Sequence, residues 1–252
     1  MITSPQNEKV KLVRALQDHA KTRRKEGKIV LDGARLVRDA LQQGNRPDFV
    51  LYTAASEVAF LAGYGVEPIP VSDAVMRAAS DTQQPQGILG VFPLPTVKLP
   101  DDARRTLILD SIRDPGNLGT ILRTAAAAGV EAVLLSPTCV DAYNPKALRG
   151  GMGAHFRVPL AEVDWEQIAH YCYNKKIYLA DSEGDAPYDA ADWRAAWALI
   201  IGGEADGAGD EALTLTQQRV YIPMAAATES LNAAVAAGVI LFEAARQSAV
   251  KS

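Results

Sequence analysis

The chain has 252 residues, 48% of them hydrophobic and 22% charged, with a formal net charge of −4 at pH 7. This is ordinary globular composition, and the length suits one large domain or two modest ones. It contains no uninterrupted apolar run of about 18 residues, and its first residues lack the apolar core of a signal peptide. We therefore expect no membrane span and a cytoplasmic protein, with Cys139 and Cys172 as reduced thiols and no metal site.

The amino-terminal segment is basic. Residues 1–28 carry eight basic and three acidic side chains, a net charge of +5, which leaves −9 for the rest of the chain. Such a segment could track a phosphate backbone, or it could be the solvated face of a helix. Charge alone leaves both interpretations open.

The first half alternates short strand-like and helix-like runs. We expect strands at 28–31, 49–52, 68–71 and 88–92, and helices at 33–43, 56–62 and 72–79. This pattern predicts a small α/β sandwich over residues 1–95. A proline-rich linker follows at 93–105.

The second half, expected as a domain over 104–252, also alternates. We expect strands at 106–109, 132–135, 177–180, 197–201 and 220–222, and helices at 118–128, 165–174 and 230–246. Near-continuous apolar strands indicate a parallel sheet covered on both faces. Ligands of such sheets gather beyond the carboxyl ends of the strands, so the loops there matter most.

The first such loop, DSIRDPGNLGTILR at 110–123, leaves a strand and enters a helix. Asn117 is by residue type a good N-cap. Arg123 lies more than one turn into the helix, and its long side chain could reach the strand ends. The alternative is that Asn117 is only a cap and Arg123 only a surface arginine.

The second loop, IIGGEADGAGD at 200–210, is rich in glycine, which permits close approach by a ligand. It lacks the G-x-G-x-x-G dinucleotide fingerprint, and Glu204 would repel phosphates. An uncharged or cationic ligand group is therefore favoured. The alternative is a turn with an exposed glutamate.

The third loop, IPMAAATESLNAAVAAG at 222–238, leads into a helix of small residues that another backbone could approach closely. Ser230 and Asn232 stand at its start, either as helix caps or as part of a site. The segment suits a pocket that holds a small molecule through main-chain groups, or a close subunit contact.

Together the three loops resemble the motifs of the SpoU (TrmH-like) branch of the SPOUT RNA methyltransferases. The motifs are NLGTILR at 117–123, IIGGEADG at 200–207, and IPM with ESLN at 222–232. The stretch NPKALRGGMGAHFRVP at 144–159 is also similar to the family. DGARLV at 32–37 and QPQG at 84–87 resemble the ribosomal-protein-like RNA-binding domain that often precedes the catalytic domain.

The resemblance implies a deep trefoil knot near the carboxyl terminus, a homodimer, and methylation of a ribose 2′-hydroxyl in RNA. It implies S-adenosylmethionine as methyl donor, bound by main-chain groups at Gly203, Ile222, Met224 and Leu231. The implied catalytic arginine is Arg123, with Asn117, Glu204, Ser230 and Asn232 completing the site. The two-domain organisation favours ribosomal RNA over transfer RNA as substrate.

Two positions depart from the family pattern, because Gly151 and Ala234 stand where the family usually has serine. These lost hydroxyls are the support for one alternative, a catalytically weak RNA-binding or ribosome-assembly protein. A Rossmann-type oxidoreductase is disfavoured by the missing dinucleotide fingerprint.

Overall fold

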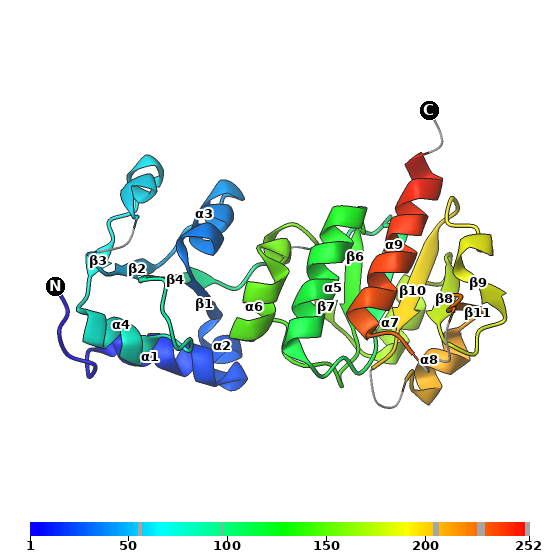
Figure 1. Ribbon diagram of the computed structural model, residues 1–252, viewed down its shortest axis with the longest axis horizontal. Helices are drawn as coiled ribbons and strands as arrows, with labels where there is room; N and C mark the ends of the chain where they lie inside the picture. The colour runs from blue at the N-terminus through cyan, green and yellow to red at the C-terminus, as the bar shows by residue number, and fades with distance from the viewer. Residues whose placement is uncertain (55–56, 97, 204–206, 226–229, 250–252) are drawn as a thin grey trace. The chain divides into compact units, whose positions relative to one another are not determined.

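The structure is a computed structural model that describes residues 1–54, 57–96, 98–203, 207–225 and 230–249 (Figure 1). The chain divides into two compact units. The first comprises Met1–Thr96 and Tyr143–Phe156, and the second comprises Val97–Ala142 and Arg157–Ser252. The chain therefore passes between the units three times.

The first unit is built on a mixed four-stranded sheet of order β1-β4-β2-β3. Its strands are β1 (Lys28–Asp32), β2 (Phe49–Tyr52), β3 (Ile69–Pro70) and β4 (Ile88–Pro93). β4 pairs antiparallel with both β1 and β2, whereas β2 and β3 run parallel. These strands confirm the α/β pattern expected for the first half.

Helices cover both faces of this sheet. Val30 of β1 packs in a core with α1 (Glu8–Asp18) and α4 (Asp73–Ala79). Its neighbours Ile29 and Leu31 pack in a second core with α3 (Ala34–Gln42). Successive strand residues point to opposite faces, so this short apolar run contributes to both cores. The helix expected at 56–62 is instead the 3₁₀ turn η1 (Ala59–Tyr64), and residues 55–56 lie outside the described residues.

Several of the basic side chains near the amino terminus have contacts within this unit. Arg23 of α2 (Ala20–Glu26) is buried and donates hydrogen bonds to main-chain carbonyls at the end of α1. Lys28 forms an ion pair of 2.6 Å with Asp48. Lys9 lies over the ring of Phe49, and Lys11 pairs with Glu8. For these four residues the charge serves the fold or a solvated helix face.

A segment from the second half of the sequence completes the first unit. Helix α6 (Pro145–Gly151) and the 3₁₀ turn η2 (Ala154–Phe156) contribute Leu148 and Phe156, both under a tenth exposed, to the core beside β1. Arg149 also donates to both carboxylate oxygens of Asp81 at 2.8 Å. The expected domain ranges, 1–95 and 104–252, had assigned this segment to the second domain.

The second unit contains a fully parallel seven-stranded sheet of order β7-β6-β5-β10-β8-β11-β9. Its strands are β5 (Arg105–Leu109), β6 (Ala132–Leu135), β7 (Leu160–Glu162), β8 (Lys176–Ala180), β9 (Ala186–Pro187), β10 (Trp197–Ile201) and β11 (Gln218–Tyr221). Every residue of β6 and β10 is buried. This confirms the expectation of a parallel sheet covered on both faces.

On one face, α5 (Pro115–Ala128) and α9 (Ala233–Ala249) lie side by side (Figure 1). On the other, α7 (Trp165–Tyr171) and α8 (Asp210–Leu215) pack on a core that includes Ile108 and Ile200. A Cβ atom added to Gly238 of α9 would lie 3.7 Å from a methyl group of Thr124 on α5. The small side chains of α9 therefore allow the close helix contact that the sequence indicated.

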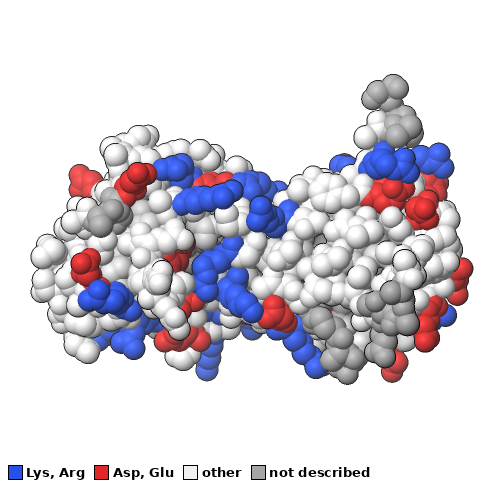
Figure 2. All heavy atoms as spheres, in the orientation of Figure 1, with Lys and Arg blue, Asp and Glu red and all other residues white. Residues whose placement is uncertain are grey.

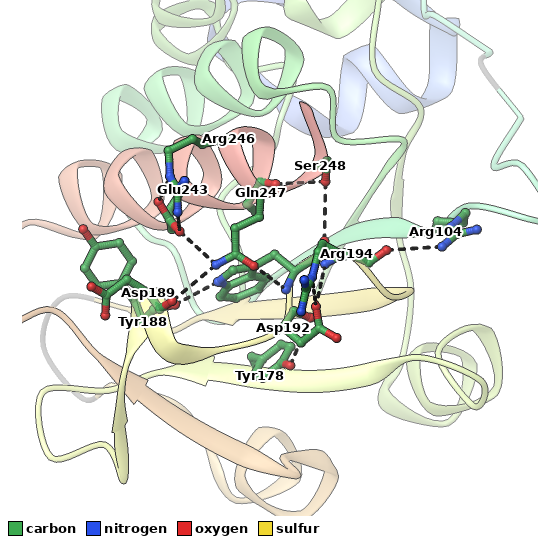
Figure 3. Close-up of polar contacts among 12 residues, drawn as sticks. Arg104, Tyr178, Tyr188, Asp189, Asp192, Arg194, Glu243, Arg246, Gln247 and Ser248 are labelled. Atoms are coloured by element: carbon green, nitrogen blue, oxygen red, sulfur yellow. Dashed lines mark hydrogen bonds and ion pairs between the residues drawn. The ribbon is translucent and has the colours of Figure 1, made fainter. Parts of the chain in front are cut away.

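The carboxyl-terminal turns of α9 are held by Gln247 (Figure 3). Its side-chain oxygen accepts from the backbone N–H of Trp193 at 3.2 Å, and its amide donates to Glu243 and to the carbonyl of Asp189. The indole of Trp193 is buried and packs edge-on against Trp197 of β10. This network fixes one end of the helix whose other end reaches the third loop.

Candidate functional site

The first loop enters α5 through a cap at Asp114 and not at Asn117, the residue that the sequence predicts. The N-cap is Asp114, whose carboxylate accepts from the backbone N–H of Asn117 at 2.8 Å. Pro115 occupies the first helical position, where a missing N–H costs no hydrogen bond. A carboxylate also interacts favourably with the helix dipole. Asn117 is therefore the third residue of the helix, and its side chain is available for another contact.

That contact is with the third loop. Asn232 donates from its amide nitrogen to the side-chain oxygen of Asn117 at 3.2 Å. The amide oxygen of Asn232 accepts from the N–H groups of Ala234 and Val235, at 2.9 and 3.3 Å. Asn232 thus caps α9, which explains why this helix begins at residue 233 and not at 230. One side chain both starts α9 and joins it to α5.

The glycines of the second loop serve close packing of the backbone. A Cβ atom on Gly202 would lie 2.6 Å from the carbonyl carbon of Gly207, and one on Gly203 would lie 2.5 Å from the carbonyl oxygen of Ser111. Gly203 and Gly207 also exchange two backbone hydrogen bonds, of 3.0 and 3.2 Å. Side chains at 202 and 203 would disrupt the loop itself, whatever ligand it holds. Glu204 lies outside the described residues.

A cavity of about 500 Å³ opens where the second and third loops meet. The four residues expected to bind the cofactor, Gly203, Ile222, Met224 and Leu231, all line it, as does Ser230. This volume lies within the range usual for small-molecule sites. The structure therefore brings the predicted cofactor residues together around one space.

One part of the cavity wall carries charged side chains that lie outside the sequence motifs. Asp181, Ser182 and Arg219 line it, and the guanidinium of Arg219 lies 3.4 Å from Asp181 and 3.6 Å from Asp185. Asp181 directly follows the apolar strand β8, a position at which a polar residue meets the ligand edge of a parallel sheet. That placement was the available signal. The wall combines apolar side chains with an acidic and a basic group, which suits an amphipathic ligand.

Arg123 does not join this cavity within one chain. It is exposed on α5 and is absent from the lining formed by the described residues. An α-helix turns by about 100° per residue, so Arg123 lies about 120° around the axis from Asn117. Its catalytic role remains a prediction.

The two departures from the family pattern lie in different surroundings. Ala234 is 5% exposed in the first turn of α9, where its methyl group contributes to helix packing. Gly151 ends α6 in the first unit and precedes Met152, which has a positive φ of 46°. Neither residue lines the cavity. The two positions without a hydroxyl therefore lie outside the wall of this cavity.

Over the residues that the structure describes, no three or more histidine, cysteine, aspartate or glutamate side chains are grouped as metal ligands would be. In the same residues no helix is long and apolar enough to cross a membrane.

Comparison with known proteins identifies the class. Residues 104–242 match the SpoU rRNA Methylase family, and residues 7–90 match the MRM3-like substrate binding domain. Because the first match covers more than half of the chain, the protein belongs to the SpoU rRNA methylase family. The resemblance found in the sequence is confirmed.

Three individual proteins illustrate how similar this chain is to known rRNA methyltransferases. The chain is 37% identical to the mitochondrial rRNA methyltransferase 3A of Danio rerio, over 89% of this chain and 65% of that protein. It is 33% identical to the 23S rRNA (guanosine(2553)-2′-O)-methyltransferase RlmP of Bacillus subtilis, over 96% of this chain and 97% of that one. An AdoMet-bound rRNA methyltransferase from Sinorhizobium meliloti is 30% identical with a TM-score of 0.86, covering 97% of each chain. The chain thus spans just under two thirds of the fish protein and nearly all of the two bacterial ones.

Proposed function

We propose that this protein transfers a methyl group from S-adenosylmethionine to a ribose 2′-hydroxyl of ribosomal RNA. The observation that carries the proposal is the cavity between the second and third loops, lined by all four residues expected to hold the methyl donor. The AdoMet-bound relative from Sinorhizobium meliloti and the rRNA 2′-O-methyltransferase of Bacillus subtilis support the cofactor and the substrate.

The residues around the cavity fit the donor molecule. Ile222, Met224 and Leu231 supply apolar surface suited to an adenine ring, while Asp181 and Arg219 supply charges suited to an amino-acid group. When bound, S-adenosylmethionine supplies an activated methyl group on a cationic sulfur. The chain's own residues must then orient the ribose hydroxyl and stabilise the negative charge that develops on its oxygen.

We assign that second task to Arg123, with Asn117, Ser230 and Asn232 as hydrogen-bonding partners of the substrate and Glu204 as support of the second loop. A guanidinium keeps its proton at any physiological pH. Arg123 therefore acts by holding the hydroxyl or the adjacent phosphate and by its positive charge, and it does not serve as a base. The hydrogen bond between Asn232 and Asn117 supports this assignment because it joins two of these residues.

A homodimer would complete the site. Val235 and Phe242, seven residues apart on one side of α9, are 52% and 54% exposed, which is unusual for large apolar side chains. The face formed by α5 and α9 shows few charged side chains except at the carboxyl end of α9 (Figure 2). Because Arg123 lies outside its own chain's cavity, we propose that a second copy covers this face and that each copy supplies Arg123 to the other's site.

Three further assignments belong to the same proposal. Residues 1–95 would bind the RNA substrate, supported by the match to a substrate binding domain. Residues 104–252 would form the methyltransferase domain, with a deep trefoil knot near the carboxyl terminus as the family resemblance implies. The protein would act in the cytoplasm.

The test compares the wild-type protein with Arg123→Ala. We expect the wild type to label ribosomal RNA from cells that lack the gene, using methyl-labelled S-adenosylmethionine. Arg123→Ala should abolish transfer while S-adenosylmethionine binding, measured by calorimetry, persists. Arg194→Ala is the matched control, because Arg194 is exposed and pairs with Asp192 away from the cavity lining.

Mapping 2′-O-methyl groups in cells with and without the gene identifies the substrate. If only transfer RNA is labelled, the substrate is transfer RNA and not ribosomal RNA. Binding of the donor without transfer to either RNA would indicate an RNA-binding or ribosome-assembly protein. Binding of NAD instead of S-adenosylmethionine would overturn the proposal.

A further inference from the structure

A buried carboxylate stands at the end of β5, next to the cavity but not in its lining. Asp110 is 3% exposed. One of its oxygens accepts from the hydroxyls of Ser111 and Ser136, at 3.1 and 3.0 Å. The other accepts from the backbone N–H of Gly209 at 2.7 Å. Hydrogen bonds to a buried carboxylate are among the stronger ones in proteins, and the partner at Gly209 lies 99 positions away in sequence.

This carboxylate and its neighbour hold both ends of the second loop. At the far end, Asp110 binds Gly209, the residue that precedes α8. At the near end, Gly203 packs directly against the carbonyl of Ser111. Gly202, Gly203 and residues 207–208 form part of the cavity wall. Asp110 and Ser111 do not line the cavity themselves, but their contacts with Gly209 and Gly203 fix the position of that part of its wall.

The backbone at this point is strained, and side chains support it. Ser111 has a positive φ of 58°, which is uncommon for a residue other than glycine. Its N–H donates to the hydroxyl of Ser136 at 3.3 Å, and its own hydroxyl lies 2.8 Å from that of Thr138. Strained residues persist where surrounding contacts over-determine them, and they cluster at functional sites. Here the strained residue begins the turn that leads to Asp114 and α5.

We propose that Asp110 is a positioning residue for the methyl donor. Through its hydrogen bond to Gly209 it holds the second loop in the binding conformation before the donor arrives, which reduces the ordering that binding requires. It does not contact the donor or the reacting atoms. The inference rests on the proposed function of the cavity as the S-adenosylmethionine site.

The experiment measures the Kd for S-adenosylmethionine by calorimetry, with kcat and KM for the donor, in Asp110→Ala and Asp110→Asn. We expect Asp110→Ala to raise Kd and KM by at least about ten-fold, because the N–H of Gly209 loses the carboxylate that holds it in place. The kcat at saturating donor should change much less. Asp110→Asn should recover most of the affinity, since its amide oxygen can accept from Gly209 while its nitrogen donates to the serine hydroxyls.

Two more variants keep the test decisive. Thr106→Val on the same strand is the control, because the Thr106 hydroxyl is fully buried and has no hydrogen-bond partner among the described residues. Should Asp110→Ala fail to fold, Ser136→Ala weakens the same network more mildly. Ser136→Ala should still raise the Kd for S-adenosylmethionine, whereas Thr106→Val should not.

Three results would overturn the inference: an unchanged Kd in Asp110→Ala with only a lower melting temperature, an Asp110→Asn variant as weak as Asp110→Ala, or an equal loss in Thr106→Val. Failure of the wild type to bind S-adenosylmethionine would instead refute the proposed function. The two failures are thus distinguishable.

Discussion

Replacing Gly203 with alanine tests the reasoning about the second loop directly. The added Cβ atom would lie 2.5 Å from the carbonyl oxygen of Ser111, about 0.9 Å short of the 3.4 Å at which ordinary contacts begin. The opposing atom belongs to the backbone of a strained residue, so it cannot rotate away as a side chain would. Either the loop or the end of β5 has to move.

The size of the effect follows from that displacement. Overpacking of this kind typically costs about 1–3 kcal/mol. If the cost falls on the loop, the donor-binding conformation becomes less populated. Since about 1.4 kcal/mol corresponds to a ten-fold change in affinity, we expect the Kd for S-adenosylmethionine to rise by about five- to 140-fold.

The assay is calorimetric titration with S-adenosylmethionine at a temperature where all variants are folded, checked by circular dichroism. Gly209→Ala is the matched control in the same loop. Gly209 has an ordinary φ of −75°, a Cβ atom there would make a normal 3.4 Å contact, and its N–H to Asp110 is kept. A Gly203→Ala protein that binds within two-fold of wild type, or a Gly209→Ala protein that loses as much, would refute the steric argument.

Four other predictions concern single side chains. Asn232→Asp keeps the oxygen that caps α9 but loses the donor to Asn117. The rate of methyl transfer should therefore fall while the melting temperature stays within about 2 °C of wild type. A loss of activity accompanied by a clear fall in melting temperature would count against a role of Asn232 in the site. Leu148→Ala should lower the free energy of unfolding by about 2–5 kcal/mol in denaturant titration, because Leu148 is 3% exposed in the core of the first unit; a loss below about 1 kcal/mol would show that α6 is not part of that core. Burial raises the pKa of the Asp32 carboxyl above its ordinary 3.8, so its ionisation destabilises the folded state as pH rises between the two values. Asp32→Asn should therefore be more stable than wild type at pH 7, with a gain that disappears below the ordinary pKa; a gain independent of pH would contradict this. Gln247→Ala should lower the free energy of unfolding by about 1–2 kcal/mol, because it leaves the backbone N–H of Trp193 without its acceptor. Arg246→Ala, which removes an exposed ion pair with Glu243, should have a smaller effect.

Much of the architecture could be predicted because it is encoded locally. The strands β6 and β10 are buried along their whole length, so each is visible as a continuous apolar run. The helix of small residues at the carboxyl terminus was recognisable for the same reason. Errors occurred at helix starts, where several polar residues compete for the N-cap. The sequence predicts Asn117 as the N-cap of α5, but the cap is Asp114, and it predicts that α9 starts at Ser230, although Asn232 caps it.

The candidate site was predictable only in part. The four residues predicted to bind the cofactor belong to motifs in two loops, and the structure gathers all four around one cavity. Asp181 and Arg219 were missed because neither belongs to a motif and they are 38 positions apart. Arg123 was placed correctly on a helix, yet no motif reveals which face of α5 it occupies relative to the cavity.

By itself, the sequence determined the family, most of the strands, several of the helices, and the two loops that line the cavity. These depend on short-range patterns: apolar runs, glycine spacing and motif residues a few positions apart. Only the tertiary structure decided that residues 143–156 complete the first unit, that Asn232 bonds to Asn117 across 115 positions, and that Asp110 holds Gly209 across 99. Such contacts depend on which strands are neighbours in the sheet, and strand order is a property of the whole fold that no local stretch of sequence contains.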